Sequence, residues 1–203
     1  MRPVVAVVDY AAGNCPSVLR ALALLGIEAR AAVHPEQLEG VTHAVLPGVG
    51  SALETMRSLR ESGMAEALAG HVAAGKPYVG ICVGLQVLFE QSEEDGAECL
   101  GWLAGSVRRL PATVRVPQIG WNLVRDTGAP AHLAEALGAH FYFVNSYVAD
   151  PADRSVVVAE ADYGGPFAAM VVAGNLCATQ FHLEKSGPRG LELLRRVVEG
   201  APC

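Results

Sequence analysis

Lysine is scarce in this chain of 203 residues, which has 2 Lys against 13 Arg and 21 acidic residues and a formal net charge of −6. The basic residues are scattered and form no basic stripe, which argues against nonspecific binding to nucleic acid or anionic membranes. Charged residues make up only 18% of the chain and hydrophobic residues 51%, which excludes a disordered chain. The composition therefore favours a globular protein with one sizeable core.

Long apolar runs and paired cysteines are also missing. No uninterrupted hydrophobic segment approaches the roughly 20 residues that cross a bilayer, and the N-terminal segment shows no signal peptide. The five cysteines are widely spaced without a C-x-x-C motif, which excludes a disulfide framework and a zinc site. We therefore expect a cytoplasmic protein with free thiols and without a membrane, nucleic acid, metal or cofactor as partner.

The first ninety residues alternate short β-branched runs with amphipathic segments. Predicted strands cover 4–8, 27–33, 43–46 and 78–81. Predicted helices cover 14–25, 51–60, 64–74 and 83–90. This order predicts a mostly parallel sheet with helices on both faces.

The second half contains short strand-like runs with few helices between them. These runs are 106–110, 115–122, 140–147, 156–160, 168–172 and 177–181. They predict extra antiparallel strands, and the amphipathic segment 187–199 predicts a closing helix. Because no repeat or linker divides the chain, we expect residues 1–203 to form a single α/β domain.

The segment GICVG (80–84) carries the first chemical signal. It places G-x-C-x-G between a predicted strand and a predicted helix, like a nucleophile elbow in which sulfur replaces oxygen. The glycines suit a tight, strained turn, and the following helix would favour a thiolate at Cys82. The backbone N–H of Val83 would then face a developing oxyanion. A buried structural cysteine beside two packing glycines is the alternative interpretation.

A thiol nucleophile needs a base, and His182 is the best placed of the six histidines. It follows the predicted strand 177–181, and ligands bind at the carboxyl ends of such strands. In extended backbone, Glu184 would point to the same side and accept a hydrogen bond from the ring. A polar turn before the last helix remains the alternative.

The segment LPGVG (46–50) also follows a strand, and its glycines allow backbone N–H groups to face a substrate oxygen. A simple strand-to-helix turn is the alternative interpretation of this segment.

Two segments resemble the signatures of class I glutamine amidotransferases: PYVGICVGLQ (77–86) and QFHLE (180–184). More narrowly, the chain resembles the glutaminase subunits of imidazole glycerol phosphate synthases. This likeness spans essentially the whole chain, on the segments DY (9–10), GN (13–14), LPGVG (46–50), FE (89–90), SEE (92–94), VPQIGWN (116–122), YFVNSY (142–147) and HLEKSG (182–187). The resemblance implies a single-domain, flavodoxin-like fold.

The resemblance also implies the site residues. Cys82 would attack the side-chain amide of glutamine to form a γ-glutamyl thioester, with His182 as proton carrier and Glu184 orienting it. The oxyanion hole would comprise Val49, Gly50 and Val83. The substrate L-glutamine would be held by Gly50, Gln86, Glu94, Ser146 and Tyr147.

The family implies a partner as well. Ammonia would pass internally to a (β/α)8 barrel synthase subunit of a heterodimer, which forms imidazole glycerol phosphate in histidine biosynthesis. Residues expected at the interface are Tyr10, Asn14, Trp121, Asn122 and Lys185. Free ammonia would be protonated near neutral pH, and shielded transfer avoids that loss.

Two positions depart from the family pattern. Leu183 stands where the family commonly has proline, which predicts a looser alignment of the base and its carboxylate. Asn145 stands where the family often has a histidine, and asparagine cannot titrate. Alternatives to the main interpretation are a glutaminase subunit of pyridoxal phosphate or anthranilate synthase, a free-standing cysteine hydrolase, and a binding module with an inert thiol.

Overall fold

The structure is a computed structural model that describes residues 2–10 and 14–200, so Gly13 and Cys203 lie outside it. Its strands are β1 (Val4–Val8), β2 (Glu28–Ala32), β3 (His43–Gly48), β4 (Tyr78–Cys82), β5 (Gln91–Ser92), β6 (Ala97–Glu98), β7 (Gly105–Arg109), β8 (Gln118–Asp126), β9 (Ala139–Asn145), β10 (Tyr147–Pro151), β11 (Val157–Asp162), β12 (Pro166–Ala173) and β13 (Leu176–Thr179). Its α-helices are α1 (Cys15–Leu24), α2 (Ala52–Glu61), α3 (Met64–Ala73), α4 (Val83–Gln86), α5 (Ala131–Ala134) and α6 (Gly187–Glu199). Short 3-10 helices are η1 (Pro35–Leu38), η2 (Arg154–Val156) and η3 (Leu183–Lys185). No helix within the two described ranges is long and apolar enough to cross a bilayer.

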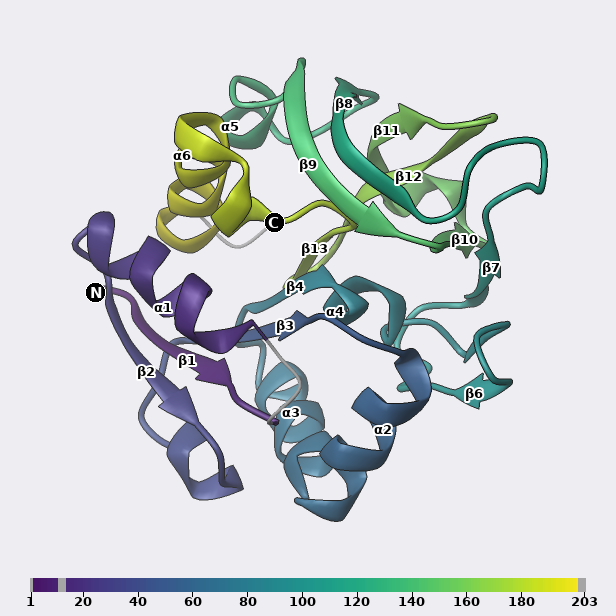
Figure 1. The fold of residues 1–203 in the computed structure, drawn as a ribbon. Helices are drawn as coiled ribbons and strands as arrows, with labels where there is room; N and C mark the ends of the chain where they lie inside the picture. Colours follow the sequence, from purple (N-terminus) through teal and green to yellow (C-terminus); the bar gives the residue numbers. More distant parts are fainter. Residues whose placement is uncertain (1, 11–13, 201–203) are drawn as a thin grey trace.

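Five parallel strands form the centre of the molecule, in the order β2-β1-β3-β4-β13. Helices α1 and α6 lie on one face of this sheet, and α2 and α3 lie on the other (Figure 1). Because both faces are covered, the side chains of Val5 to Val8 are almost wholly buried. The parallel sheet with helices on both faces, expected from the first ninety residues, is confirmed.

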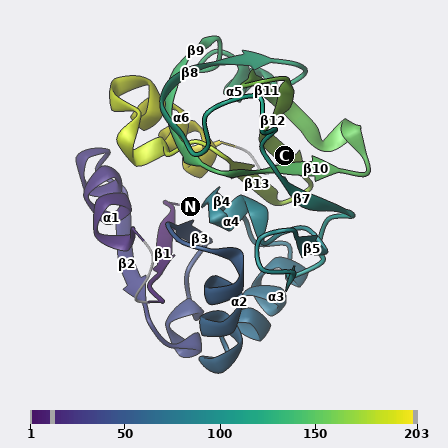
Figure 2. The ribbon, with the colours of Figure 1, turned by 45° about the vertical axis from the view of Figure 1, so that its right-hand side comes forward.

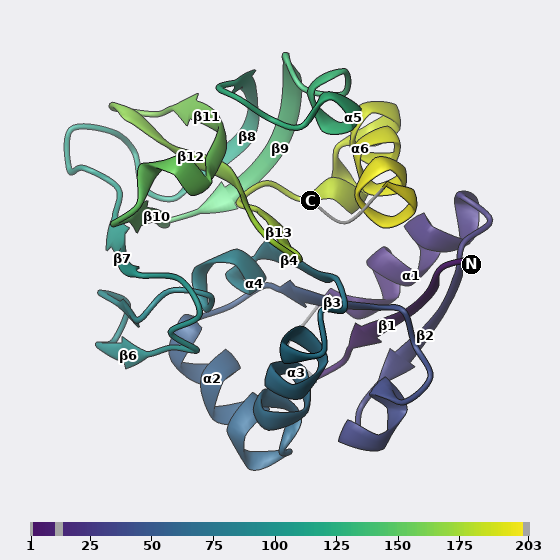
Figure 3. The same ribbon diagram turned by 180° about the vertical axis from the view of Figure 1, so that it is seen from behind.

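Antiparallel strands extend the sheet beyond β13. Strand β12 pairs antiparallel with β13 and with β10, and β10 pairs antiparallel with β7. Strands β11, β8 and β9 branch from β12, so that the long β8–β9 ribbon curves over this side of the molecule, away from β2 (Figure 2, Figure 3). The predicted antiparallel strands of the second half are therefore confirmed.

Several elements differ from the prediction: α5, β5 and β6 were not expected, and the strand expected over 115–122 is β8 at Gln118–Asp126. Two further differences lie next to the site. The helix expected over 83–90 ends at Gln86, because the backbone that follows bonds to a later segment: Leu100 donates to the Val87 carbonyl at 2.9 Å, and Trp102 donates to the Leu88 carbonyl at 2.9 Å. The run 140–147 divides into two strands, because β9 pairs with β8 whereas β10 pairs with β7 and β12. Both differences come from long-range pairing that local sequence does not encode.

Candidate active site

The turn between β4 and α4 holds Cys82 in a conformation that side chains rarely adopt, with φ 56° and ψ −105°. Both flanking glycines are required by close packing. A Cβ at Gly84 would overlap the backbone carbonyl of Leu46, and a Cβ at Gly80 would overlap the carbonyl of Gly84. The expected strand–turn–helix around G-x-C-x-G is therefore present, and its strain is concentrated at the cysteine.

The Cys82 side chain is only 3% exposed and lies between one acceptor and one donor. Its Sγ donates to the carbonyl oxygen of Val144 at 3.8 Å. It accepts from Nε2 of Gln180 at 3.6 Å. Burial distinguishes it little from Cys15 and Cys99, whose pKa burial raises to about 11. What sets Cys82 apart is its set of neighbours.

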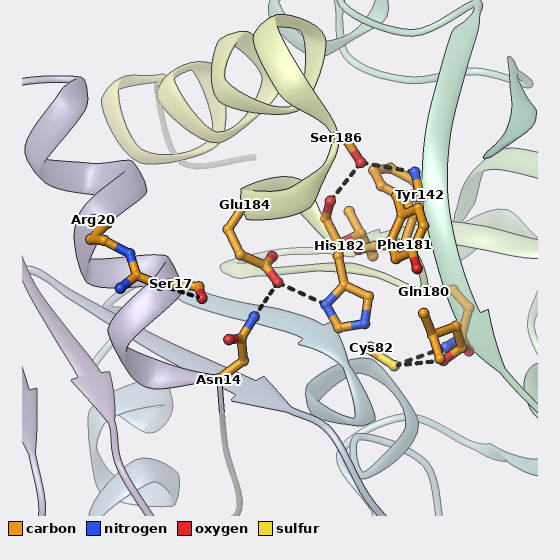
Figure 4. A network of polar contacts seen from close by, with 12 residues as sticks. Asn14, Ser17, Arg20, Cys82, Tyr142, Gln180, Phe181, His182, Glu184 and Ser186 are labelled. Carbon is orange, nitrogen blue, oxygen red and sulfur yellow. Dashed lines mark hydrogen bonds and ion pairs between the residues drawn. The ribbon is translucent and has the colours of Figure 1, made fainter. Parts of the chain in front are cut away.

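His182 and Glu184 form a buried pair beside that sulfur (Figure 4). Nδ1 of His182 contacts Oε1 of Glu184 at 2.8 Å, and the amide of Asn14 donates to the same oxygen at 2.6 Å. The contact was expected from an extended backbone, and that reason is wrong. His182 instead forms an isolated antiparallel bridge with Tyr142, and the chain then turns directly into the 3-10 helix η3, Leu183–Lys185. The turn, not an extended segment, brings ring and carboxylate together.

The charges of this pair reinforce each other. Burial lowers the pKa of His182, but its interactions with Cys82 and Glu184 outweigh burial and raise that pKa from 6.5 to about 9. Burial raises the pKa of Glu184, but its hydrogen bonds with His182 and Asn14 prevail and lower it. The ring therefore carries a proton, and the carboxylate is ionised, at neutral pH. Nε2, the ring nitrogen on the Cys82 side, makes no hydrogen bond within the described part of the chain, as is common before a substrate binds.

A serine fixes the loop that carries the base. Oγ of Ser186 donates to the carbonyl of His182 at 2.5 Å and accepts from the backbone N–H of Tyr142 at 2.9 Å. The side chain of Leu183 is fully buried beneath this loop. Burial and these hydrogen bonds hold the turn, and the looser alignment expected from leucine in place of proline stays a prediction.

A cavity of about 360 Å³ opens at the sulfur. It is lined by Val49, Gly50, Cys82, Val83, Gln86, Glu94, Pro117, Val144, Asn145, Ser146, Tyr147, His182 and Lys185. Every residue that the sequence assigned to the oxyanion hole or to glutamine binding is in this set, although their roles stay predictions. Among residues 2–10 and 14–200, no three His, Cys, Asp or Glu side chains gather as a metal site.

The polar groups of the cavity wall have defined partners. Oε2 of Glu94 accepts from the N–H of Ala52 at the start of α2, at 2.8 Å, and burial raises the pKa of Glu94. Nε2 of Gln86 donates to the carbonyl of Tyr147 and to Oε1 of Gln180, both at 3.1 Å. Sequence analysis missed Gln180, whose only signal was its position two residues before the histidine.

Some predicted interface residues lie inside the protein. Tyr10 is buried, with Thr55 donating to its hydroxyl at 3.4 Å, and burial raises its pKa to about 12. Asn14 contacts Glu184 and so belongs to the network around the base. Asn145, which was not predicted at the interface and stands where the family often has histidine, is also buried, and its amide donates to the carbonyl of Tyr147 at 3.1 Å. A surface role for Tyr10 is therefore hard to reconcile with its burial, whereas Asn14 is half-buried.

The other predicted interface residues lie near the surface. Trp121 on β8 is 57% exposed, and its ring meets that of Tyr142 edge-on with centroids 6.0 Å apart. The amide of Asn122 donates to the carbonyl of Asp162 at 2.9 Å. Lys185 lines the mouth of the cavity. Their contact with a partner stays a prediction.

Comparisons with known proteins agree with this geometry. The family model for glutamine amidotransferase class-I matches residues 6–200. The imidazole glycerol phosphate synthase subunit HisH of Herpetosiphon aurantiacus is 45% identical over 196 residues, covering 96% of this chain and 93% of that protein. The subunit of the same name from Chloroflexus aurantiacus is 44% identical over 200 residues, covering 96% and 94%.

Solved structures show the same fold. A crystal structure of a glutamine amidotransferase superposes with a TM-score of 0.77 at 26% identity and covers 97% of both chains. The structure of PurLQS from Thermotoga maritima superposes with a TM-score of 0.79 at 20% identity, covering 98% of this chain and 99% of that one. At that identity the second likeness concerns the fold alone.

Proposed function

The chain belongs to the class I glutamine amidotransferase family, and from this premise we propose that it is the glutaminase subunit of an imidazole glycerol phosphate synthase. Residues 1–203 act as one amidotransferase domain that hydrolyses L-glutamine to L-glutamate and ammonia. The observation that carries the proposal is the cavity where the Cys82 sulfur faces the buried His182–Glu184 pair, in a chain 45% identical to a HisH subunit.

The triad residues divide the reaction between them. The Cys82 thiolate bonds to the amide carbon of glutamine, and the carbon–nitrogen bond breaks as protonated His182 gives its proton to the departing ammonia. Water then attacks the γ-glutamyl thioester, passes a proton to His182 and releases the carboxyl product and the thiolate. Glu184 stays ionised throughout and stabilises the imidazolium.

The cavity wall supplies binding and charge stabilisation. Backbone N–H groups of Val49, Gly50 and Val83 receive the oxyanion of the tetrahedral intermediate. The carboxylate of Glu94 suits the ammonium group of an amino acid. The rest of the glutamine is held by Gly50, Gln86, Ser146 and Tyr147, which line the same cavity.

Ammonia then passes to a (β/α)8 synthase subunit, which uses it to form imidazole glycerol phosphate and the aminoimidazole carboxamide ribotide in L-histidine biosynthesis. Trp121, Asn122 and Lys185 serve the interface, together with the half-buried Asn14, whereas Tyr10 is buried and is left out of it. Ile119 and Trp121 are 65% and 57% exposed, and Ile119 pairs with the exposed Val144, which lines the cavity. Because neighbouring exposed apolar side chains mark interaction surfaces, these residues support a docking surface beside the cavity.

The test is transfer of the amide nitrogen. The chain is mixed with the synthase subunit of the same organism, amide-¹⁵N glutamine and unlabelled ammonium, and the label in imidazole glycerol phosphate is measured. We expect ¹⁵N in the product with wild type, and unlabelled product from ammonium alone with Cys82→Ser. Equal labelling by Cys82→Ser would refute the assigned nucleophile. Rapid glutamate formation without the partner would instead favour a free-standing hydrolase, and product formation only with another synthase would favour a different pathway.

A further inference from the structure

We infer that Gln180 is the hydrogen-bond donor that holds the nucleophilic sulfur of Cys82, and that Gln86 fixes the direction in which it donates. The inference rests on the proposed function, because it assigns a role in the same site. Gln180 is completely buried, and its backbone N–H is already used by the Ala169 carbonyl at 2.8 Å. Its side-chain amide lies beside the sulfur (Figure 4).

The orientation of the Gln180 amide follows from a chain of hydrogen bonds that runs from the Tyr147 carbonyl through Gln86 and Gln180 to the Cys82 sulfur. The carbonyl of Tyr147 can only accept, so the group of Gln86 that faces it at 3.1 Å must be the amide nitrogen. The same nitrogen reaches the side chain of Gln180 at 3.1 Å, so the atom facing it there must be the oxygen. The remaining group of Gln180, its NH₂, therefore faces the Cys82 sulfur at 3.6 Å.

This donor matters most once the thiol has ionised. A neutral thiol can both donate to the Val144 carbonyl, 3.8 Å away, and accept from Gln180. A thiolate has no proton to donate, so it loses the first interaction and keeps the second. Hydrogen bonds to an ionised acceptor are about twice as strong as neutral ones, so the Gln180 amide favours the thiolate.

The ionisable groups around the sulfur are known. His182 and Tyr10 both interact electrostatically with Cys82, and Glu94 and Lys185 line the same cavity. None of these is altered when Gln180 is replaced. A change in the ionisation of the thiol in a Gln180 variant therefore reports on the amide itself.

The experiment measures alkylation of Cys82 by iodoacetamide against pH, with the modified peptide quantified by mass spectrometry. Gln180→Met keeps the volume and removes the donor. Gln180→Leu also removes the donor without adding a charge, and it serves if the first variant is unstable. The matched control is Gln118→Met, since Gln118 is also buried, at 3% exposure, and its Oε1 has no hydrogen-bond partner among the described residues.

We expect the pH of half-maximal alkylation to rise by about one unit in Gln180→Met, with alkylation slowed about 10-fold at pH values below the wild-type midpoint, the effect of losing a hydrogen bond to a charged acceptor. Gln180→Leu should shift it by a similar amount, and Gln118→Met should not shift it. In the complex with the synthase, kcat for glutamine hydrolysis should fall about 10- to 100-fold in Gln180→Met.

Unshifted alkylation midpoints in both folded Gln180 variants would overturn the inference, even if kcat fell, because a residue that only packs the cavity would produce that result. Failure of the proposed function is a separate outcome. It would appear as absent glutaminase activity in the wild-type complex, while the alkylation comparison, which needs no glutamine, would still decide the role of Gln180.

Discussion

Replacing Glu184 by glutamine separates the charge of the catalytic pair from its shape. Asn14 donates to Oε1 of Glu184 at 2.6 Å, so in the variant it would keep an oxygen, not the new NH₂, at that position. Nδ1 of His182 donates to the same atom at 2.8 Å and so keeps its proton and orientation. The new NH₂ would replace Oε2, which has no hydrogen-bond partner in the described chain. Glu184→Gln therefore removes the negative charge and little else.

The size of the effect follows from the pKa of His182. Burial lowers this pKa, and interactions with Cys82 and Glu184 raise it overall from 6.5 to about 9. That rise corresponds to about 3 kcal/mol, at about 1.4 kcal/mol per pH unit. The variant keeps the hydrogen bond and loses only its charge, a difference of about 1–2 kcal/mol between charged and neutral hydrogen bonds, so we expect kcat to fall about 5- to 30-fold.

The assay is kcat for glutamine hydrolysis by the complex as a function of pH. The alkaline limb, where the imidazolium loses its proton, should move to lower pH by about one unit in Glu184→Gln.

The pH dependence of the unfolding free energy gives a second measurement. Because the folded pKa of His182 lies above its unfolded value, the bound proton stabilises the fold fully below about pH 6.5 and the contribution is lost as pH rises through about 9. This alkaline loss of unfolding free energy should be smaller in the variant.

Two results would refute this reasoning. A fall in kcat of about 10⁴-fold would mean that the ring had lost its tautomer or orientation, so Asn14 would not be holding the amide. An alkaline limb that stays in place would mean that the charge of Glu184 does not hold the proton on His182.

Three further predictions test packing, the base-bearing loop and the docking surface. Gly84→Ala should lower the free energy of unfolding in urea by about 3 kcal/mol or more, because its Cβ would meet a backbone carbonyl, whereas Gly70→Ala on the exposed side of α3 should raise it by about 0.5–1 kcal/mol. Ser186→Ala should cost about 2 kcal/mol of unfolding free energy and lower kcat, because two buried hydrogen bonds are lost; unchanged values of both would contradict this. Trp121→Ala should weaken synthase binding in calorimetry about 30-fold, while Leu24→Ala, at a site 77% exposed on α1, should not; equal effects would count against a docking role for the tryptophan.

Strong local signals made much of the fold predictable from sequence. The last helix was expected over 187–199 and is Gly187–Glu199, because its apolar stripe and Pro188 at its start are local features. The strand over 4–8 was equally clear from its β-branched residues. Cys82, with glycines two residues away on each side, could also be identified, because backbone packing admits no side chain at those glycines.

The features that were not predicted correctly from the sequence depend on contacts between segments that are separated along the chain. Helix α4 ends early because residues 87–89 bond to residues 100–103. The turn at η3 depends on Ser186, which bonds both to its own loop and to β9. Gln180 could not be identified from spacing, because its role depends on Gln86, 94 residues earlier in the chain. In each case a hydrogen bond across the fold outweighs the local preference.

One strand sets the relation between nucleophile and base. On β9, the carbonyl of Tyr142 accepts from the backbone N–H of His182 at 2.9 Å, and the carbonyl of Val144 accepts from the Cys82 sulfur at 3.8 Å. Residues two apart on a strand are separated by about 6.6 Å. The two halves of the site are thus held on one pleated backbone, although they lie a hundred residues apart in sequence. A displacement of β9 would move the acceptor of the thiol and the anchor of the histidine together, and so would change their distance less than a displacement of either loop alone.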